Sequence, residues 1–423
     1  MILIKDGRVV DPYSGIDEVI DVIIDNGKIA GLGKYARSDE YEKVIDAKGK
    51  IVAPGLVDVH VHFRDPGLTY KEDLETGANA AAAGGYTTVV CMANTKPVVD
   101  SAETLSGIIE RAEKLPIHVL QAAAVTKGLK GIELTDMEAL RKAGAAGFTD
   151  DGIPIGDVKV LLAALNRAKE LNVPVSLHEE DPNLVGSYGI NQGPVSEKVG
   201  VAGAPALAEE TLIARDGLLA LKTGARVNIQ HISSKTSVDI IRLLKKLGAD
   251  LFAEVTPQHF SLTEQTVLEK GTLAKVNPPL RTEEDRYGLI AGLKDGTIDI
   301  IATDHAPHSR EEKAKEMTDA PSGMIGLETA LALGITHLVR KGHMTMIQML
   351  EKMTVNPAKL YNLDCGKIKE GENADLVIFD ERERWIVDGD CFHSKSANSP
   401  FIGQELYGKV KYTICCGNVV YEE

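Results

Sequence analysis

The sequence predicts a (β/α)8 barrel that carries a small β-rich domain built by both ends of the chain. Two observations lead to this fold class. Short apolar runs alternate with helix-like stretches through the middle of the chain, and strand-like sequence without helices returns at both ends. Strands that alternate with helices are typical of parallel sheets, and eight such repeats are typical of a closed barrel. We expect the composite β-domain in residues 1–52 plus 366–423 and the barrel in residues 53–365.

The two ends of the chain have the same kind of sequence, with short strand-like runs and turn residues. Near the start, ILIKDGRVVDP, EVIDVIIDNGKIAGLG and KVIDAKGKIVAPG are short strand-like runs with Asp-Gly and Asn-Gly turns between or within them. Such dipeptides between apolar runs are strong hairpin signals. Near the end, ADLVIFD, ERWIV and KVKYTICCGNVVYEE have the same character. We therefore expect both ends to contribute to one sheet.

The middle of the chain contains runs rich in apolar and β-branched residues, each short enough for a buried parallel strand. They are residues 55–61, 86–92, 117–124, 145–151, 173–178, 226–232, 249–255 and 298–304. Stretches with helical character separate most of them. Residues 179–206 contain glycine and proline and lack a helical period, so we expect a surface loop there.

Composition limits the class of protein. The chain has 423 residues, of which 43% are hydrophobic and 26% charged, as in ordinary globular enzymes. A net charge of -15 without a basic stripe argues against nucleic-acid binding. No signal peptide is expected from the opening MILIKDGRVVDP, and no apolar run approaches the roughly 20 residues of a membrane span. The chain is therefore expected to bind neither nucleic acid nor membrane.

The five cysteines show neither CxxC pairs nor a disulfide-like framework. This usage is typical of a reducing compartment and predicts a cytoplasmic protein. None of the cysteines has the spacing of a metal site. We therefore expect any metal ion to be held by nitrogen and oxygen.

Histidines and aspartates gather where the expected barrel strands end, which is where barrel active sites lie. They are His60, His62, Asp150, Asp151, His178, His231 and Asp304. Side chains at positions i and i+2 of a strand share a face, so His60 and His62 should point the same way. Imidazole and carboxylate are ligands of zinc and similar divalent ions. Because six ligands are too many for one catalytic ion, we expect two ions that share a bridge.

The expected division places His60, His62 and Asp304 on one ion and His178 and His231 on the other, with Asp151 between them. Strand alternation lets only one of Asp150 and Asp151 face inward. Among the other histidines, His118 and His259 lie on or after strands, so their position alone does not exclude them. His305 should point away from the site, whereas His308 lies on the loop beyond the last strand and is a plausible substrate contact.

The motifs DVHVHFRDPG, FTDDG, SLHEED, IQHIS, VNPPLR and ATDHAPH together resemble the bacterial class I dihydroorotases of the amidohydrolase superfamily. The segment GKIKEGENADLVIFD resembles the β-domain return of the same superfamily, so the resemblance runs the length of the chain. HxH alone marks only the superfamily. HxHxR together with NPPLR and DHAPH is more specific.

The resemblance implies a zinc-dependent, reversible hydrolysis of dihydroorotate to N-carbamoyl-L-aspartate, a step of pyrimidine (UMP) biosynthesis. It implies two Zn²⁺ ions bridged by Asp151 and a hydroxide, with Asp304 as both ligand and catalytic proton shuttle. The implied substrate contacts are His62, Arg64, Asn94, Asn277, His308, Ser322 and Gly323. Carboxylate binding would explain why Arg64 follows the two histidines, since a guanidinium can bind the carboxylate of dihydroorotate with two hydrogen bonds.

Two positions depart from the pattern of that family. Glu179 stands where the family often has cysteine, and Ser322 stands where it often has phenylalanine. Other interpretations also remain for single residues. Arg64 could form a structural ion pair with Asp58 or Asp65, and the two asparagines could serve turns.

Two other functions compete with this one. One is a different cyclic amidase, such as a dihydropyrimidinase, hydantoinase or allantoinase. Those relatives usually bridge their metals with a carboxylated lysine, and FTDDG offers no lysine. The other is a non-catalytic scaffold of the same fold, which should have replaced ligands. As partners we expect a small-molecule substrate, a second copy in a homodimer, since cyclic dimers are the commonest oligomers, and in some settings aspartate carbamoyltransferase.

Overall fold

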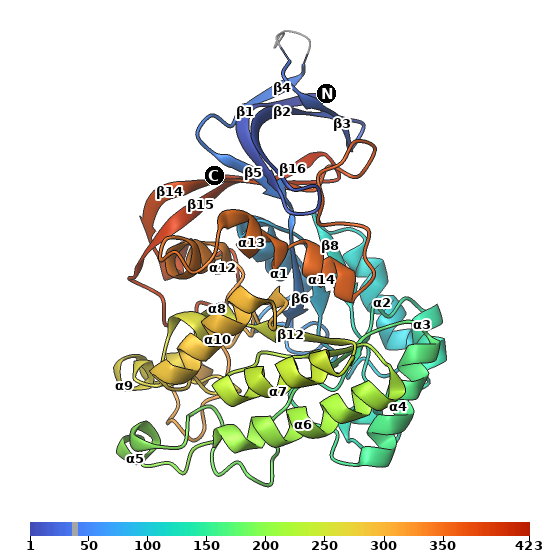
Figure 1. Cartoon of the computed structure of the whole chain (residues 1–423), viewed down its shortest axis with the longest axis vertical. Coiled ribbons are helices and arrows are strands. Elements are labelled where there is room, and N and C mark those ends of the chain that lie inside the picture. The colour runs from blue at the N-terminus through green and yellow to red at the C-terminus, as the bar shows by residue number, and fades with distance from the viewer. Residues whose placement is uncertain (36–40) are drawn as a thin grey trace.

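The computed structural model describes residues 1–35 and 41–423, and these divide into a β-sheet part and a barrel part (Figure 1). Both chain ends lie in the β-sheet part. The barrel begins where the chain passes from β5 (Ile51–Pro54) to β6 (Leu56–Val61). Between them, the Gly55 backbone N–H donates to the carbonyl of Asp375 at 2.8 Å. The β-sheet part therefore adjoins the amino ends of the barrel strands.

The sheet in this part has the strand order β16-β15-β14-β5-β1-β2-β3, with β4 beside β1. Its strands, besides β5, are β1 (Ile2–Asp11), β2 (Ile16–Asp25), β3 (Lys28–Gly33), β4 (Lys43–Asp46), β14 (Leu376–Ile386), β15 (Glu405–Cys415) and β16 (Asn418–Glu422). Asn26 and Gly27 both have positive φ, at 48° and 78°, as a tight hairpin between β2 and β3 requires. Val377 of β14 pairs with Ala53 of β5, which joins the two ends of the chain.

One hydrophobic cluster of this sheet contains buried side chains from both ends, such as Val22 and Ile378. Strand β5 spans the predicted limit between residues 52 and 53. The division into residues 1–52 plus 366–423 and 53–365 stays a prediction.

The barrel strands are parallel, and each lies inside one of the predicted runs. Besides β6 they are β7 (Tyr86–Cys91), β8 (His118–Gln121), β9 (Phe148–Thr149), β10 (Val175–Leu177), β11 (Val227–Ile229), β12 (Leu251–Val255) and β13 (Ile300–Ile301). They form two arcs, β6-β7-β8 and β13-β12-β11-β10-β9. Parallel bridges from Ala123 to Phe148 and from Val61 to His305 join the arcs. The predicted (β/α)8 barrel is thereby confirmed.

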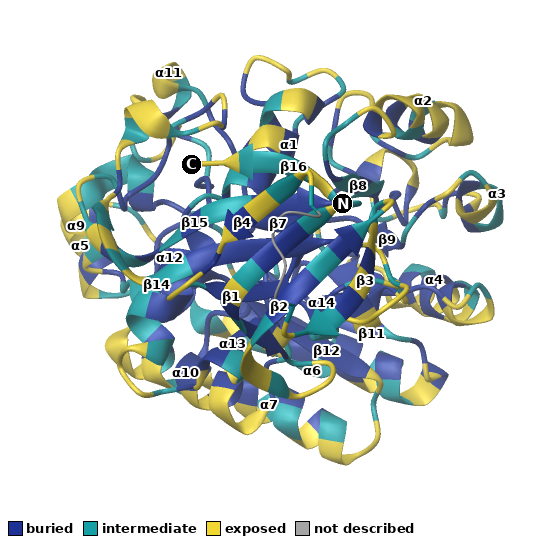
Figure 2. Ribbon diagram, turned by 90° about the horizontal axis from the view of Figure 1, so that it is seen from above, coloured by how far each residue is buried: buried dark blue, intermediate teal, exposed yellow. Residues whose placement is uncertain are grey.

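Helices surround the strands, and their outer faces are exposed (Figure 2). The longer ones are α1 (Leu74–Ala83), α2 (Ala102–Ala112), α4 (Val158–Glu170), α6 (Ala206–Thr223), α7 (Lys235–Lys246) and α10 (Glu283–Asp295). Helix α4 shows why such segments form. Asp157 caps it by accepting from the Lys159 backbone N–H, and Leu161, Ala164, Leu165 and Ala168 make one buried face.

Shorter helices fill the connections. They are α3 (Met137–Lys142), α5 (Pro194–Val199), α8 (Pro257–Ser261), α9 (Thr266–Lys270), α11 (Arg310–Lys313), α12 (Ala330–Gly334), α13 (Met346–Glu351) and α14 (Val355–Leu360). Single turns of 3₁₀ or π type cover Lys127–Leu129, Gly271–Ala274, Ile335–Val339 and Gly389–Cys391.

The expected surface loop over residues 179–206 is partly wrong. The segment contains α5, and Asn191 and Val195 within it are buried. Arg281 holds it to the body of the barrel by donating to Asn191 Oδ1 and to the carbonyl of Ala204 at 2.8 and 2.7 Å. Sequence analysis also missed the following α6. Its buried face includes the charged Glu209, which disguises the apolar period.

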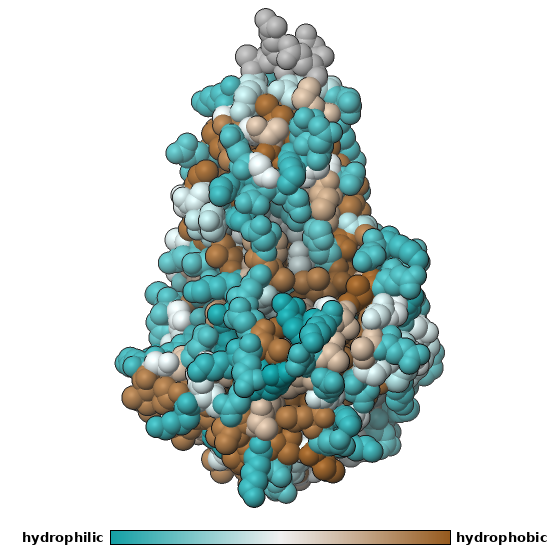
Figure 3. Space-filling model, turned by 90° about the vertical axis from the view of Figure 1, so that its right-hand side faces the viewer, coloured by the Kyte–Doolittle hydropathy of each residue, from teal (hydrophilic) through white to brown (hydrophobic). Residues whose placement is uncertain are grey.

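Among the described residues, no helix combines the length and apolar character that a membrane crossing needs. On the face drawn in Figure 3, hydrophobic residues occur in patches that hydrophilic residues separate.

Candidate metal centre

The barrel brings the predicted ligands to one place at the carboxyl ends of its strands. His60 belongs to β6 and His62 follows its last residue, while Asp151, His178, His231 and Asp304 follow β9, β10, β11 and β13. All six side chains are buried. Parallel strands that close into a barrel end on the same rim, and this explains how residues so far apart in sequence meet.

Asp151 lies between His60 and His62 on one side and the histidines that follow β10 and β11 on the other. Its two carboxylate oxygens are 3.3 Å from His60 Nε2 and 3.4 Å from His62 Nε2. On the other side, His178 Nδ1 is 4.0 Å from Asp151 Oδ1 and 2.9 Å from His231 Nε2. Asp304 Oδ1 completes the first group at 3.1 Å from His62 Nε2.

The donor atoms fit metal ions. Within the described residues, His60, His62 and Asp151 form one group whose ligand atoms lie within 4.8 Å of one another, and Asp151, His178 and His231 form another. Every donor is an imidazole nitrogen or a carboxylate oxygen, the set that suits zinc and other borderline divalent ions. Each group could hold a metal ion, and Asp151 belongs to both.

Three of the four imidazoles have a second polar group beside their outer nitrogen, as a hydrogen bond for His62 and at ion-pair distance for His60 and His178. His60 Nδ1 lies 3.4 Å from Glu254 Oε2, His62 Nδ1 lies 2.9 Å from Asn94 Oδ1, and His178 Nε2 lies 3.5 Å from Glu180 Oε2. Such partners fix the ring and its tautomer in metal sites. The nitrogens left for metal are therefore Nε2 of His60, Nε2 of His62 and Nδ1 of His178.

Sequence analysis missed the two orienting glutamates. Glu254 is a lone acid inside the apolar strand LFAEV of β12, and it is fully buried. A charged residue is almost never fully buried without a partner, so this pattern was the available signal. Glu180 stands two residues after His178, where no strand period marks it.

The charges of the centre depend on one another. Burial alone would raise the pKa of Asp151, but the imidazoles of His60, His62 and His178 outweigh it and hold that pKa well below its usual range. Burial, and then the neighbouring His178 and His60, lower the pKa of His231 well below its ordinary value. The deprotonated carboxylate and the neutral imidazole are the forms in which Asp151 and His231 bind metal. For His60 the opposite holds, since burial alone would lower its pKa but Glu254 and Asp151 outweigh burial and raise that pKa, so a bound metal ion would have to displace a proton there.

The neighbouring Asp150 has a different role. Its carboxylate accepts from the backbone N–H groups of Val125 and Thr126 at 2.7 and 3.0 Å. Burial raises its pKa to about 6. The structure thus turns Asp151 toward the histidines and Asp150 away from them.

Several residues of the centre have strained backbone. Arg64, His231 and Asp304 have φ of 58°, 32° and 48°, in the left-handed region that side chains other than glycine rarely adopt. Such conformations collect at functional sites, where the surrounding structure enforces them.

A cavity of about 180 Å³ opens beside the centre. The predicted ligands other than His60 line it, and so do all the predicted substrate contacts. Those contacts are His62, Arg64, Asn94, Asn277, His308, Ser322 and Gly323. His60 lies behind the wall with no exposed surface.

Arg64 faces this cavity, and no acid among the described residues forms an ion pair with it. Its Nε donates to the carbonyl of Pro307 at 3.3 Å. The two acids considered for an ion pair are used elsewhere, since Asp65 binds Arg111 at 2.9 Å and Asp58 accepts from the Thr303 backbone N–H at 3.1 Å. Arg64 is therefore a cation available to an anionic ligand.

Two further side chains of the cavity wall have free or neutral polar atoms. Among the described residues, Asn277 Oδ1 is buried with no hydrogen-bond partner. His308 lies 2.9 Å from the carbonyl of Ser322 through Nε2 and 3.2 Å from Lys71 Nζ through Nδ1. Burial, and then Arg64 and Lys71, lower the pKa of His308, so its ring is neutral.

The remaining histidines named from the sequence stay outside the two groups of ligands. His259 lies 2.9 Å from the carbonyl of Pro278, and burial lowers its pKa to about 4. His305 lies 3.4 Å from Glu72, on the side away from the centre. His118 begins β8 and so lies at the opposite end of the barrel.

A (β/α)8 barrel with histidine and aspartate ligands at its carboxyl rim defines a metal-dependent hydrolase of the amidohydrolase type. The family model described as "Amidohydrolase family" matches residues 51–420, and the chain belongs to that family. The curated relatives it resembles include the dihydroorotase of Clostridioides difficile (strain 630), 61% identical over 421 residues with 100% of both chains covered. The dihydroorotase of Lactococcus lactis subsp. lactis is 55% identical, with 100% of this chain and 99% of the relative covered.

Solved structures agree on the fold. The L-hydantoinase (dihydropyrimidinase) from Arthrobacter aurescens has a TM-score of 0.88 at 27% identity, covering 100% of this chain and 96% of that one. The dihydropyrimidinase from Brevibacillus agri NCHU1002 has a TM-score of 0.86 at 25% identity, covering 99% and 95%.

Proposed function

We propose that the chain is a dihydroorotase, which interconverts dihydroorotate and N-carbamoyl-L-aspartate in pyrimidine (UMP) biosynthesis. The observation that carries this choice of substrate is Arg64. It faces the cavity beside the ligand groups, and the acids near it in sequence are bound elsewhere. Full-length dihydroorotase relatives at 51–61% identity support the same reaction.

In this proposal the substrate carboxylate binds the guanidinium of Arg64, whose planar fork matches it. Asn277 also lines the cavity, and its unpartnered Oδ1 can accept a hydrogen bond from a ring N–H of the substrate. The neutral His308 contacts a ring carbonyl, and the backbone at Ser322 and Gly323 closes that side of the cavity. Asn94 both lines the cavity and links two ligands, because its Nδ2 donates to Asp151 Oδ2 at 3.0 Å.

We assign two zinc ions to the centre. His60, His62 and Asp304 would hold one, His178 and His231 the other, and Asp151 would bridge them. When bound, such ions acidify water and polarise the amide carbonyl. The donor set of imidazoles and carboxylates supports zinc, and the membership of Asp151 in both groups supports the bridge.

Asp304 is the proposed proton carrier. Its Oδ1 lies 3.1 Å from His62 Nε2 and 3.5 Å from His60 Nε2, so it faces the place where water must attack. As general base it removes the proton of the attacking water, and as general acid it delivers that proton to the leaving amide nitrogen. In the cyclisation direction, the same carboxylate first takes the proton from the nitrogen.

The rival is a cyclic amidase for uncharged rings, which the hydantoinase and dihydropyrimidinase structures represent. Hydantoins and dihydropyrimidines lack the carboxylate that Arg64 would bind. A half-buried guanidinium facing such a ring would remain unpaired, at a cost in binding. Arg64 therefore favours dihydroorotate.

The test is hydrolysis of dihydroorotate beside dihydrouracil by the purified, zinc-loaded chain and by Arg64→Ala. We expect turnover of dihydroorotate, and a fall in kcat/KM of about 10²-fold in the variant, because two hydrogen bonds to a charged group are lost. Arg111→Ala is the matched control, since that arginine pairs with Asp65 outside the cavity. Turnover of dihydrouracil alone, unaffected by Arg64→Ala, would instead establish the rival.

The oligomeric state, the protein partner and the cellular compartment are also proposals. We propose a homodimer, since cyclic dimers are the commonest oligomers, and an association with aspartate carbamoyltransferase, whose reaction makes carbamoyl-aspartate. The free state of all five cysteines supports a reducing cytoplasm. Light scattering on a sizing column, with and without the transferase, measures both assemblies.

A further inference from the structure

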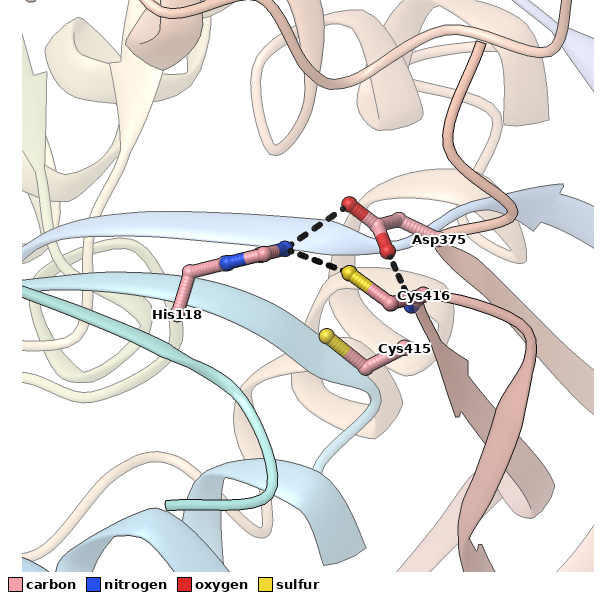
Figure 4. Close-up of side chains that lie close together, drawn as sticks. All are labelled: His118, Asp375, Cys415 and Cys416. Atoms are coloured by element: carbon pink, nitrogen blue, oxygen red, sulfur yellow. Dashed lines mark hydrogen bonds and ion pairs between the residues drawn. The ribbon is translucent and has the colours of Figure 1, made fainter. Parts of the chain in front are cut away.

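A second group of metal-ligating side chains lies at the opposite end of the barrel (Figure 4). It combines His118 of β8, Asp375 just before β14, and Cys415 and Cys416 at the end of β15. Their ligand atoms all lie within 4.8 Å of one another. Figure 4 shows both sulfurs directed toward the imidazole of His118.

The distances match a tetrahedral ion. Zinc bonds of 2.0–2.3 Å place tetrahedral ligand atoms roughly 3.3–3.8 Å from each other. His118 Nε2 is 3.2 Å from Asp375 Oδ2 and 3.6 Å from Cys416 Sγ. The imidazole, the carboxylate and one sulfur are therefore already spaced as ligands of one ion.

The backbone explains how adjacent cysteines face the same side. Neighbouring side chains on a strand point to opposite faces. Cys416 leaves the strand with a left-handed φ of 47°, at the turn into β16, and this brings its sulfur round beside that of Cys415. Cys416 and Gly417 both have positive φ, at 47° and 76°, as a tight hairpin between Cys415 and Asn418 requires, so the turn itself places the Cys416 sulfur beside that of Cys415.

The surroundings suit a bound cation. Cys415 and Asp375 are 4% and 6% exposed, whereas the His118 side chain is 37% exposed beside a cavity of about 600 Å³, which gives an ion a way in. The Cys416 backbone N–H donates to Asp375 Oδ1 at 2.7 Å, which orients the carboxylate and leaves Oδ2 toward His118. Burial raises the pKa of both thiols, so without an ion they stay neutral.

We propose that His118, Asp375, Cys415 and Cys416 bind a structural zinc ion that ties the barrel to the β-sheet formed by the chain ends. Two thiolates with an imidazole and a carboxylate are a zinc-type donor set. The ligands come from β8 of the barrel and from the segments at β14 and β15, so the ion would join the two parts. The site makes no contact with the centre at the carboxyl rim, and its role does not depend on the proposed reaction.

The test uses Co²⁺ as a spectroscopic substitute for zinc in the full chain, stripped of metal under reducing conditions. The centre at the rim has only nitrogen and oxygen donors, so a near-ultraviolet sulfur-to-cobalt charge-transfer band reports the cysteine site alone. The rim centre takes up Co²⁺ as well, so we expect the intensity of the band at saturation to correspond to one thiolate-bound Co²⁺ per chain, and the band to disappear in the double variant Cys415→Ser/Cys416→Ser. Cys391→Ser, which changes an exposed cysteine, should keep the band.

A chain without the band, or a double variant that keeps it, would overturn the proposal. If the double variant fails to fold by circular dichroism, His118→Ala decides the matter, because it retains both thiols. We expect its affinity for Zn²⁺ at this site, measured by competition with a chelator, to fall at least about tenfold. An unchanged affinity would mean that His118 and Asp375 form only an ion pair. Zinc binding should also release protons from the thiols, and zinc uptake without proton release would count against thiolate ligation.

Discussion

The two ends of the barrel hold two different groups of residues that could hold metal ions. At the carboxyl rim, histidines and aspartates come from the ends of parallel strands, line a cavity and include strained residues such as Arg64 and Asp304. At the amino end, His118 meets residues of the terminal sheet, and two of the donors are sulfur. The first arrangement leaves room for a substrate beside the ligands. The second encloses its ligands between two parts of the fold, as structural sites do.

Removal of metal should show the largest difference between the roles of the two ends. Chelation of the whole chain should reduce dihydroorotate hydrolysis to background, because the residues at the rim cannot activate water alone. Added Zn²⁺ should restore activity in the wild type and equally in Cys415→Ser/Cys416→Ser. Turnover and metal content are measured together, and a double variant that zinc cannot reactivate would show that the two ends are coupled.

Replacing the proton carrier should have the next largest effect. Asp304→Asn should lower kcat by about 10²–10⁴-fold, the range for loss of a general acid and base. Zinc analysis of the same sample is essential, since Asp304 is also a proposed ligand. Near-normal kcat with full zinc would assign the proton transfer to another group.

Loss of an orienting carboxylate should cost less. Glu254→Gln, behind His60, should lower zinc affinity or activity by about 10–100-fold, as for other groups that orient a ligand. The exposed Glu113→Gln is the control with the same chemistry. The zinc affinity, measured by competition with a chelator, and kcat are the readouts. Equal values for Glu254→Gln and Glu113→Gln would show that Glu254 does not orient His60.

The smallest effect is expected at the amino end. The double cysteine variant should keep kcat within about twofold of wild type, because its residues lie far from the cavity along the strands. Zinc at about 100 times its Kd stabilises a folded site by about 2.7 kcal/mol, so the variant should gain less in Tm from added zinc than Cys391→Ser does. An equal rise in Tm with zinc in both variants would contradict the proposal that a zinc ion joins the barrel to the terminal sheet.

The sequence predicts the rim of the barrel well and the amino end poorly. Each barrel strand lies within a predicted run. Five of the predicted ligands form the two groups at the rim and Asp304 lies beside His62, because strand ends in a (β/α)8 barrel share one rim. Helix α6 and the orienting Glu254 escaped prediction. In both, buried acids interrupt the apolar pattern on which such predictions depend.

By itself, the sequence determined the fold class, the ligands at strand ends and the family resemblance, because these depend on local periods of two and 3.6 residues and on short motifs. Strand alternation left Asp150 and Asp151 open and only the resemblance favoured Asp151, whereas the tertiary structure turns Asp150 to the backbone of Val125 and Asp151 to the histidines. It also showed that, among the described residues, Arg64 lacks an acid partner. It alone brought His118 to Cys415 and Cys416, nearly 300 residues away. No local spacing encodes that meeting, since it depends on the return of the chain end to the sheet that adjoins the barrel.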